Sequence, residues 1–218
     1  MPMKLYNNDL SPFTTRVRLQ IRAKGLENDV QIVPRPDIDL YKAINPTGKV
    51  PCLDTGAGFN LPESETICEF IEDSFPEPSL RGHTALGKAK VRLFSRFADL
   101  YIMDGLGVLF GQVSANPRDP ARVDEGFRKL DEGMRLIETY LSGHLYATEE
   151  RFTLADCALV PTLFFCSVMP PGFGRTPFEG RAKVKAYYER IIADDMHCAR
   201  AVQEMGVALQ AFMKARAA

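Results

Sequence analysis

The chain has 218 residues, of which 45% are hydrophobic and 25% charged, a composition typical of a soluble globular protein with one large or two small domains. Its 27 Lys and Arg residues nearly balance 28 Asp and Glu residues, so a net charge of -1 provides no basic surface for nucleic acid or an anionic membrane. The N-terminus lacks the apolar run of a signal peptide, and the most apolar window, 158–165, is too short to span a bilayer. We therefore expect a cytoplasmic protein.

The cysteines and histidines show no metal-site spacing. The five cysteines are odd in number and contain no Cys-x-x-Cys pair, which argues against a disulfide framework and against a zinc site. The three histidines stand far apart, so metal chemistry has no support. We expect reduced, mostly buried thiols at Cys52, Cys68, Cys157, Cys166 and Cys198.

The first third of the chain alternates strand and helix signals in a βαβ order. The first helix mixes apolar and basic residues, which predicts one buried face, and Gly25 suits its C-terminal cap. We predict, in order, a strand over 3–6, a helix over 12–24, a strand over 30–33, a loop rich in Pro and Asp, a strand over 50–53, a hairpin turn over 55–58 into a strand over 59–61, and a helix that begins at Ser64.

The rest of the chain reads as helical. The proline-rich segment Phe75-Pro76-Glu77-Pro78-Ser79 ends the preceding helix and predicts the linker between two domains. Periodic apolar residues then predict a long helix over 85–113 and another through 127–141. Thr153 to Asp156 resembles a capping box at the start of an apolar helix, and Pro161 is expected to kink or reset that helix. Two further helices are expected near 178–193 and 197–214.

Ser11 lies between the first strand and the first helix, and two interpretations of it stay open. As an N-cap, it would satisfy a backbone N–H of the first turn. As part of an anion site, its hydroxyl would act with the free N–H groups and the helix dipole, worth about 0.3–1 kcal/mol, to stabilise a thiolate or an oxyanion. Pro12 suits the first helical position in either case.

Two later segments carry candidate binding groups. The turn over 45–51 delivers Val50 in extended conformation ahead of Pro51. Most bonds of this kind are trans, but a cis Val50–Pro51 bond would free the backbone of Val50 to pair with an extended peptide. Ser64 is placed to cap the next helix, and together with Glu63 it could bind a carboxylate and an ammonium group. A plain N-cap followed by acidic residues would explain the same pattern.

Taken together, these motifs resemble the glutathione transferase superfamily over nearly the whole chain. Each motif is weak alone, but the four in this order and at these spacings are specific. They are Ser11-Pro12-Phe13 with Arg16-Val17-Arg18 behind it, Asn45-Pro46-x-Gly48-Lys49-Val50-Pro51, Glu63-Ser64 followed by Ile67-Cys68-Glu69-Phe70-Ile71, and Thr153-Leu154-Ala155-Asp156. The resemblance implies an N-terminal thioredoxin-like glutathione-binding domain over 1–78. It also implies an all-helical domain over 84–218 that contributes the hydrophobic substrate site.

The resemblance also implies glutathione as the cofactor and assigns residues to it. The bond before Pro51 is cis in such proteins, and the backbone of Val50 grips the cysteinyl part of glutathione. Glu63 and Ser64 hold the γ-glutamyl end. Lys49 matches a position that often approaches the glycyl carboxylate.

Ser11 matches the position that faces the glutathione sulfur, and Phe13 lines the entrance to the second substrate site. The triplet that begins at Ser11 is most similar to the plant tau class, whereas the omega class has cysteine in that place. A cysteine supports thiol transfer, but a serine can only donate a hydrogen bond, so Ser11 predicts thiolate stabilisation. Tyr6, near the end of the first strand, is the competing donor, because other transferase classes use a tyrosine there.

The implied activity is attack of the glutathione thiolate on a small hydrophobic electrophile, in detoxification by conjugation or in dehalogenation, ether cleavage or isomerisation. The segment over 63–76 is similar to that of bacterial etherases, and family members are usually homodimers. An apolar stripe on the long helix, which the loop over 170–174 would border, either walls the electrophile pocket or forms core: Phe94, Phe97, Tyr101, Met103, Leu106 and Phe110. Two alternatives stay open: a non-catalytic binding protein with this fold, like the stringent starvation proteins, and thiol oxidoreduction through Cys52 or Cys68.

Overall fold

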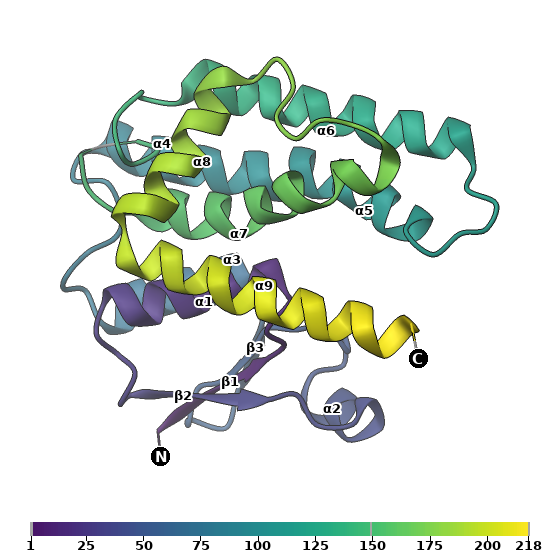
Figure 1. Ribbon diagram of the computed structural model, residues 1–218. Helices are drawn as coiled ribbons and strands as arrows, with labels where there is room; N and C mark the ends of the chain where they lie inside the picture. The colour runs from purple at the N-terminus through teal and green to yellow at the C-terminus, as the bar shows by residue number, and fades with distance from the viewer. Residues whose placement is uncertain (1, 149, 218) are drawn as a thin grey trace. The chain divides into compact units, whose positions relative to one another are not determined.

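The computed structural model describes residues 2–148 and 150–217 (Figure 1). Three residues lie outside the described part of the chain: Met1, Glu149 and Ala218. The first predicted domain begins at Met1, and the second ends at Ala218. The chain divides into two compact units, Met1–Arg81 with Asp195–Ala218, and Gly82–Asp194. The C-terminal helix therefore groups with the N-terminal unit, whereas the sequence analysis placed it with the helical domain.

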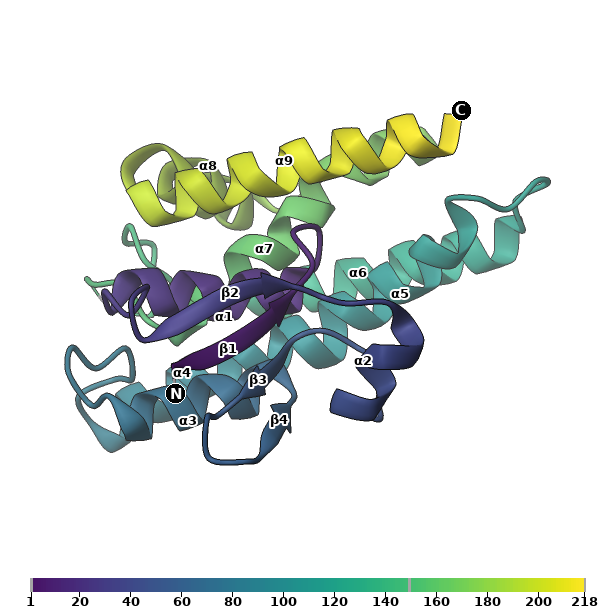
Figure 2. The same cartoon turned by 90° about the horizontal axis from the view of Figure 1, so that it is seen from below.

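A four-stranded sheet forms the base of the first unit, in the order β2-β1-β3-β4 (Figure 2). Its strands are β1 (Met3–Asn7), β2 (Val30–Pro34), β3 (Cys52–Asp54) and β4 (Asn60–Pro62). Strands β1 and β2 are parallel, so the crossover helix α1 (Pro12–Ala23) joins them, and β3 and β4 form the predicted antiparallel hairpin. In the centre of the sheet Leu5 pairs with Leu53, and both side chains are fully buried.

Two local predictions in this unit were wrong. The predicted strand over 50–53 begins only at Cys52, so Val50 lies before the sheet. The loop rich in Pro and Asp contains a short helix, α2 (Ile38–Ile44). Only Tyr41 of α2 is buried, so the helix has almost no apolar face for a periodicity argument to detect.

Helix α1 is buried on nearly all sides instead of on one face, since every residue from Thr14 to Arg22 is buried. It contacts α3 (Ser64–Ser74) and α9 (Met196–Ala217). Its basic side chains are buried because acidic partners neutralise them: Arg18 pairs with Asp9 at 2.7 Å and Arg22 pairs with Glu204 of α9 at 2.8 Å. The Arg22–Glu204 pair joins α9 to α1 within the first unit.

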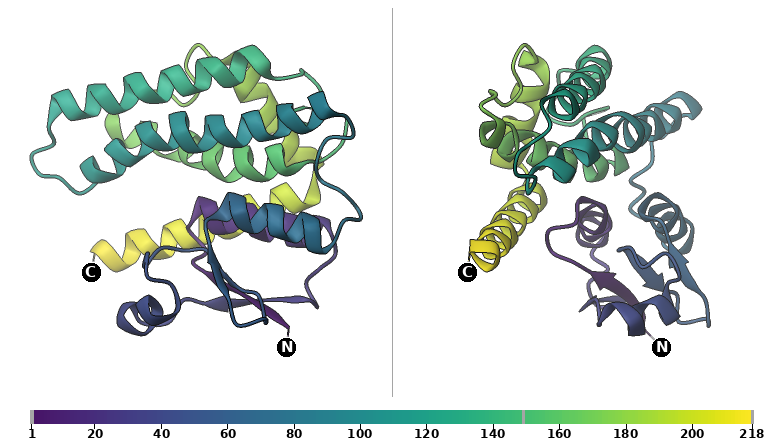
Figure 3. Two further views of the ribbon diagram at one scale, coloured as in Figure 1. Left: turned by 180° about the vertical axis from the view of Figure 1, so that it is seen from behind. Right: turned by 90° about the vertical axis from the view of Figure 1, so that its right-hand side faces the viewer.

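The second unit is helical. The predicted long helix is present as α4 (Ala85–Phe97), a π-helical turn (Ala98–Ile102) and α5 (Met103–Gln112), and α6 (Pro120–Tyr140) lies alongside (Figure 3). Glycines allow this close approach, because a Cβ atom at Gly105 would lie 2.6 Å from the backbone nitrogen of Leu130. The remaining elements are α7 (Leu154–Val168), a 3-10 turn (Pro170–Phe173) and α8 (Ala182–Asp194). Helix α8 thus begins four residues later than predicted.

Helix α7 is the core of the second unit. The predicted capping box is confirmed at Thr153 and Asp156, and the helix continues through Pro161 without ending there. The stretch Leu154–Phe173 is long and apolar enough to cross a membrane by length and composition, so the expectation that the apolar segment is too short was wrong. In the 18-residue window with this apolar composition, 83% of the residues are buried inside the protein, as in the core helix of a folded domain.

Candidate functional site

A cavity of about 120 Å³ opens in the first unit among three segments that are far apart in sequence. The first turn of α1, the loop between α2 and β3, and the junction of β4 with α3 form its walls. Six of its seven described lining residues are those that the sequence predicts as binding residues, and Thr47 is the seventh. The six are Phe13, Lys49, Val50, Pro51, Glu63 and Ser64.

Side-chain hydrogen bonds hold the loop that carries Lys49 and Val50. The Tyr41 hydroxyl and the Asn45 amide both donate to the carbonyl oxygen of Lys49, at 2.9 and 2.8 Å. The side-chain oxygen of Asn45 accepts from the backbone N–H and the hydroxyl of Thr47, at 3.2 and 3.0 Å. The peptide bond after Val50 is cis. Val50 lines the cavity and lies outside the strands, where an extended peptide can pair with its backbone.

The junction of β4 and α3 has an unusual backbone. Glu63 adopts a left-handed conformation with φ of 70°, which costs roughly 1–3 kcal/mol in a non-glycine residue and is typical of functional sites. The structure makes Glu63 the N-cap residue and Ser64 the first residue of α3, so the expectation that Ser64 caps the helix was wrong. The Ser64 hydroxyl instead accepts a hydrogen bond from Arg16. Its backbone N–H belongs to the first turn of α3, whose free N–H groups can receive a carboxylate.

Arg16 joins two walls of the cavity, a role that the sequence alone does not predict for it. Its side chain is only 2% exposed, and its Nη1 donates to Ser64 Oγ and to Glu65 Oε2, both at 3.3 Å. The guanidinium carbon also lies 5.9 Å from the centre of the Phe13 ring. Arg16 belongs to the Arg16-Val17-Arg18 segment, one of the motifs that resemble the family. This resemblance is the one indication in the sequence that Arg16 has a role at the site. Its partners could not be identified, because they lie 48 and 49 residues further along the chain.

Ser11 is the N-cap of α1 and is not among the described residues that line the cavity. Its Oγ accepts from the Thr14 N–H at 3.3 Å, and its carbonyl oxygen accepts from the Thr15 N–H at 3.0 Å. A cap uses only a lone pair of the hydroxyl, so the hydroxyl hydrogen can still be donated to an anion. The structure thus contains the cap, and the role of Ser11 toward a thiolate stays a prediction.

Tyr6, the competing donor, packs within the sheet. Its ring lies edge-on to that of Tyr41, with the two centroids 5.6 Å apart. Burial raises the pKa of Tyr6, and the charges of Asp54 and Cys52 raise it further. Neither Tyr6 nor Ser11 is among the described residues that line the cavity, so the choice between these two donors stays a prediction.

The cysteines are poorly suited to thiol chemistry. All five are buried thiols outside any disulfide. Burial, together with the nearby Asp54, raises the pKa of Cys52 to about 11, and burial likewise raises the pKa of Cys68. The thiolate is the nucleophilic form, so these thiols are unreactive near neutral pH. This environment argues against thiol oxidoreduction through either residue.

The apolar stripe of the long helix divides between core and surface. Phe94, Phe97 and Leu106 are at most 6% exposed and belong to the core of the helical unit. Tyr101 and Phe110, in contrast, are 39% and 38% exposed. Core packing therefore accounts for half of the stripe, and an electrophile pocket on the exposed residues stays a prediction.

The sheet of the first unit and the helical second unit have the predicted fold class, a thioredoxin-like domain followed by a helical bundle. The family model "Glutathione S-transferase, N-terminal domain" matches residues 10–74, and "Glutathione S-transferase, C-terminal domain" matches residues 120–190. Glutathione S-transferase 3 of Zea mays is 31% identical over 210 residues, which cover 88% of this chain and 90% of the maize protein. The chain belongs to the glutathione transferase superfamily.

Relatives within the family differ in the reaction that their names state. Maleylpyruvate isomerase of Ralstonia sp is 31% identical over 173 residues, which cover 73% of this chain and 80% of the isomerase. A glutathione S-transferase of Methylobacterium radiotolerans, crystallised in complex with glutathione sulfonate, superposes with a TM-score of 0.78. That structure is 23% identical and covers 93% of this chain and 95% of its own. Membership of the family therefore leaves the reaction subtype open.

Proposed function

We propose that the protein is a glutathione transferase that binds glutathione at the cavity of the first unit and activates its thiol for attack on a small hydrophobic electrophile. The observation that carries the proposal is the composition of that cavity. Six residues chosen from three separate sequence motifs line it together. The bound glutathione sulfonate named for one structural neighbour and the transferase name of the maize relative support the same choice of cofactor.

The polar groups of the cavity match the ends of glutathione. The free N–H groups at the start of α3, where Ser64 lies, donate to the γ-glutamyl carboxylate, and the Glu63 carboxylate pairs with the γ-glutamyl ammonium. The cavity is too small to hold all of glutathione. The part of the tripeptide outside the cavity runs along Val50, whose backbone pairs with the cysteinyl unit. Lys49 at the same wall provides a cation for the glycyl carboxylate.

Ser11 supplies the chemistry of activation. When bound, glutathione provides a thiolate that forms a carbon–sulfur bond with the electrophile. A free thiol titrates near pH 8.5, and lowering its pKa by about two units requires roughly 2.7 kcal/mol of differential stabilisation. One charge-assisted hydrogen bond from the Ser11 hydroxyl, added to the N-terminal dipole of α1, is of this size. Because no thiol of the protein itself is exposed, Ser11 acts as a hydrogen-bond donor and not as a partner in thiol exchange.

The finer features of the activity belong to the same proposal. Conjugation, dehalogenation, ether cleavage and isomerisation all begin with the same thiolate, so the cavity does not select among them. Detoxification, a homodimer and a cytoplasmic location follow from the family and remain part of the proposal. Light scattering after gel filtration measures the molecular mass in solution directly. A mass equal to that of one chain would contradict the proposed homodimer.

The proposal is tested by glutathione titration calorimetry together with a conjugation assay that uses a generic aryl halide. We expect Ser64→Ala to weaken glutathione binding, because its hydroxyl connects the cavity to Arg16. We expect Ser11→Ala to retain binding and to lose most turnover. Thr84→Ala is the matched control, because Thr84 caps α4 with a hydrogen bond from the Gly87 N–H at 3.0 Å. It removes an N-cap in the helical unit and leaves turnover unchanged.

Each outcome has a defined meaning. Absence of glutathione binding in the wild-type protein refutes the proposal. Binding without turnover of any aryl halide, aryl ether or maleyl compound would instead identify a non-catalytic binding protein with this fold. Turnover that survives Ser11→Ala but is lost in Tyr6→Phe would transfer the donor role to Tyr6.

A further inference from the structure

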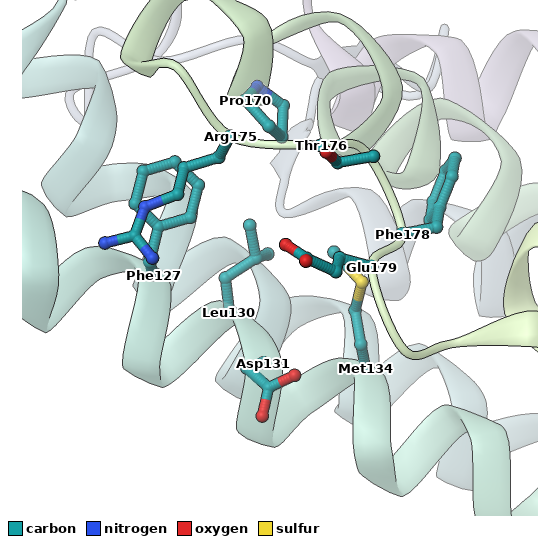
Figure 4. A pocket seen from close by; sticks show the side chains of 9 residues that line it. All are labelled: Phe127, Leu130, Asp131, Met134, Pro170, Arg175, Thr176, Phe178 and Glu179. Carbon is teal, nitrogen blue, oxygen red and sulfur yellow. The ribbon is translucent and has the colours of Figure 1, made fainter.

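The helical unit contains a larger cavity, of about 280 Å³, between α6 and the loop that precedes α8. Leu130 and Met134 of α6 form an apolar floor and are 2% and 5% exposed (Figure 4). Phe127 and Phe178 stand at opposite ends of it. All its lining residues belong to Gly82–Asp194, so this cavity is made of other residues than the candidate glutathione site.

The backbone of the loop holds Phe178 in the wall of this cavity. Phe178 has φ of 55°, a left-handed conformation that is costly for an aromatic residue. Its side chain is nevertheless 7% exposed and contacts the Tyr188 ring, with centroids 5.6 Å apart. The ring is therefore fixed on one side of the cavity by α8, and the wall is formed before any ligand arrives.

The charges around the cavity leave one carboxylate unpaired. Asp131 pairs with Arg181 at 2.5 Å, and Arg175 pairs with Asp124 at 2.9 Å. Among the described residues, Glu179 takes part in no ion pair and no hydrogen bond, and Figure 4 shows its carboxylate reaching over the apolar floor.

Arg175, the one cation among the described lining residues, is turned away from that carboxylate. The guanidinium carbon of Arg175 lies 5.2 Å from the centre of the Phe127 ring, and Figure 4 places it at the far end of the cavity from Glu179. Since Asp124 and Phe127 occupy Arg175, the charge available to a ligand at the centre of the cavity is negative.

We propose that this cavity binds a small organic ammonium ion. Its ammonium group pairs with the Glu179 carboxylate, and its apolar body lies on Leu130 and Met134 against the Phe178 ring. The volume is slightly below the roughly 300–1,000 Å³ of typical ligand pockets, so the ligand is a compact amine with one ring or a short chain. This site is independent of the proposed glutathione chemistry.

The experiment is a calorimetric titration of the full chain with phenethylamine. Phenylethyl alcohol and phenylacetate serve as neutral and anionic probes of similar shape. We expect phenethylamine to bind at least about tenfold more tightly than either, because only the amine carries a positive charge that can form an ion pair with the Glu179 carboxylate. Glu179→Gln should weaken amine binding by about tenfold and leave the alcohol unaffected. Thr176→Phe, at an exposed position of the same wall, should abolish binding of every probe by filling the cavity.

Glu189→Gln is the matched control, because Glu189 is an exposed glutamate of α8 that does not line the cavity. It should bind phenethylamine like the wild-type protein. The proposal is overturned if phenethylamine shows no saturable binding up to about 10 mM, if the alcohol binds equally well, or if Glu179→Gln binds the amine unchanged. Glutathione titrations of the same variants should match the wild type, so failure here is distinguishable from failure of the proposed transferase function.

Discussion

A buried ion pair ties α1 and α3 to the segment that leads into the second unit. Lys24 Nζ lies 3.0 Å from Glu72 Oε1, and the two side chains are 0% and 1% exposed. Lys24 also donates to the Pro78 carbonyl oxygen at 2.6 Å. The second oxygen of Glu72 accepts from the Leu80 N–H at 3.0 Å. Replacing one member of this pair therefore perturbs both helices and the segment after α3.

We predict that Lys24→Met lowers the free energy of unfolding by roughly 3–5 kcal/mol, because it leaves the Glu72 carboxylate buried without its cation. In a chain of this size each kcal/mol shifts Tm by roughly 2–4 °C, so the expected fall in Tm is roughly 6–20 °C. Adding Glu72→Gln removes the unpaired charge and keeps an acceptor for the Leu80 N–H. The double variant should therefore be more stable than Lys24→Met alone.

Urea denaturation of the wild type, both single variants and the double variant gives the free energy of unfolding of each protein. Together these four values form a double-mutant cycle. Lys185→Met is the control, since its pair with Glu189 is exposed at 3.8 Å and is expected to contribute less than about 0.5 kcal/mol. A double variant whose loss equals the sum of the two single losses would show that Lys24 and Glu72 do not interact. That result would refute the assignment of the pair as a coupled buried unit.

Four other predictions follow from buried groups. Arg16→Met should weaken glutathione binding by roughly tenfold in calorimetry, and unchanged binding would contradict its role in holding the cavity walls. With Ellman's reagent the native protein should expose none of its five thiols, and all five should react after denaturation; rapid labelling of the native form would contradict their burial. Burial raises the pKa of Asp156 to about 6, against hydrogen bonds that lower it, so the native state holds a proton more tightly than the unfolded chain. Thermal melts should therefore lose stability as pH rises from about 4 to about 6, and Asp156→Asn should remove this slope; equal slopes would contradict it. Gly105→Ala should destabilise the protein, because a Cβ atom there meets the backbone of α6. Gly107→Ala places its Cβ atom in open space and should raise the free energy of unfolding by roughly 0.5–1 kcal/mol. Equal effects of the two substitutions on Tm would contradict the close approach of α5 and α6.

The local signals in the sequence were sufficient for the sheet and for most helices. Strand β1, the hairpin of β3 and β4, and the capping box at Thr153 depend on short patterns of a few residues, and all are present. Helix α2 was missed because its only buried residue, Tyr41, leaves no periodic apolar face. The burial of α1 was underestimated for a different reason. Arg22 is buried only because Glu204, 182 residues away, supplies its partner, and no local pattern contains that information.

The candidate site was predictable as far as it depends on contiguous motifs. Val50 and Glu63 belong to motifs whose order in the chain resembles a known family, and both line the cavity. The parts that were missed depend on tertiary contacts. Arg16 has a role only through Ser64 on another helix, and the left-handed backbone of Glu63 is not encoded by a glycine. Ser11 remains a cap in the structure, so its catalytic role depends on a measurement.

The most direct test of the central claim is the pKa of the glutathione thiol when glutathione is bound to this protein. It is measured from the thiolate absorbance as a function of pH. For the wild type we predict a thiol pKa about two units below its free value near 8.5. Ser11→Ala should bind glutathione and return the thiol pKa most of the way to the free value. A bound thiol with the same pKa in both proteins would contradict the account, because the hydroxyl at the start of α1 would then contribute nothing to thiolate activation.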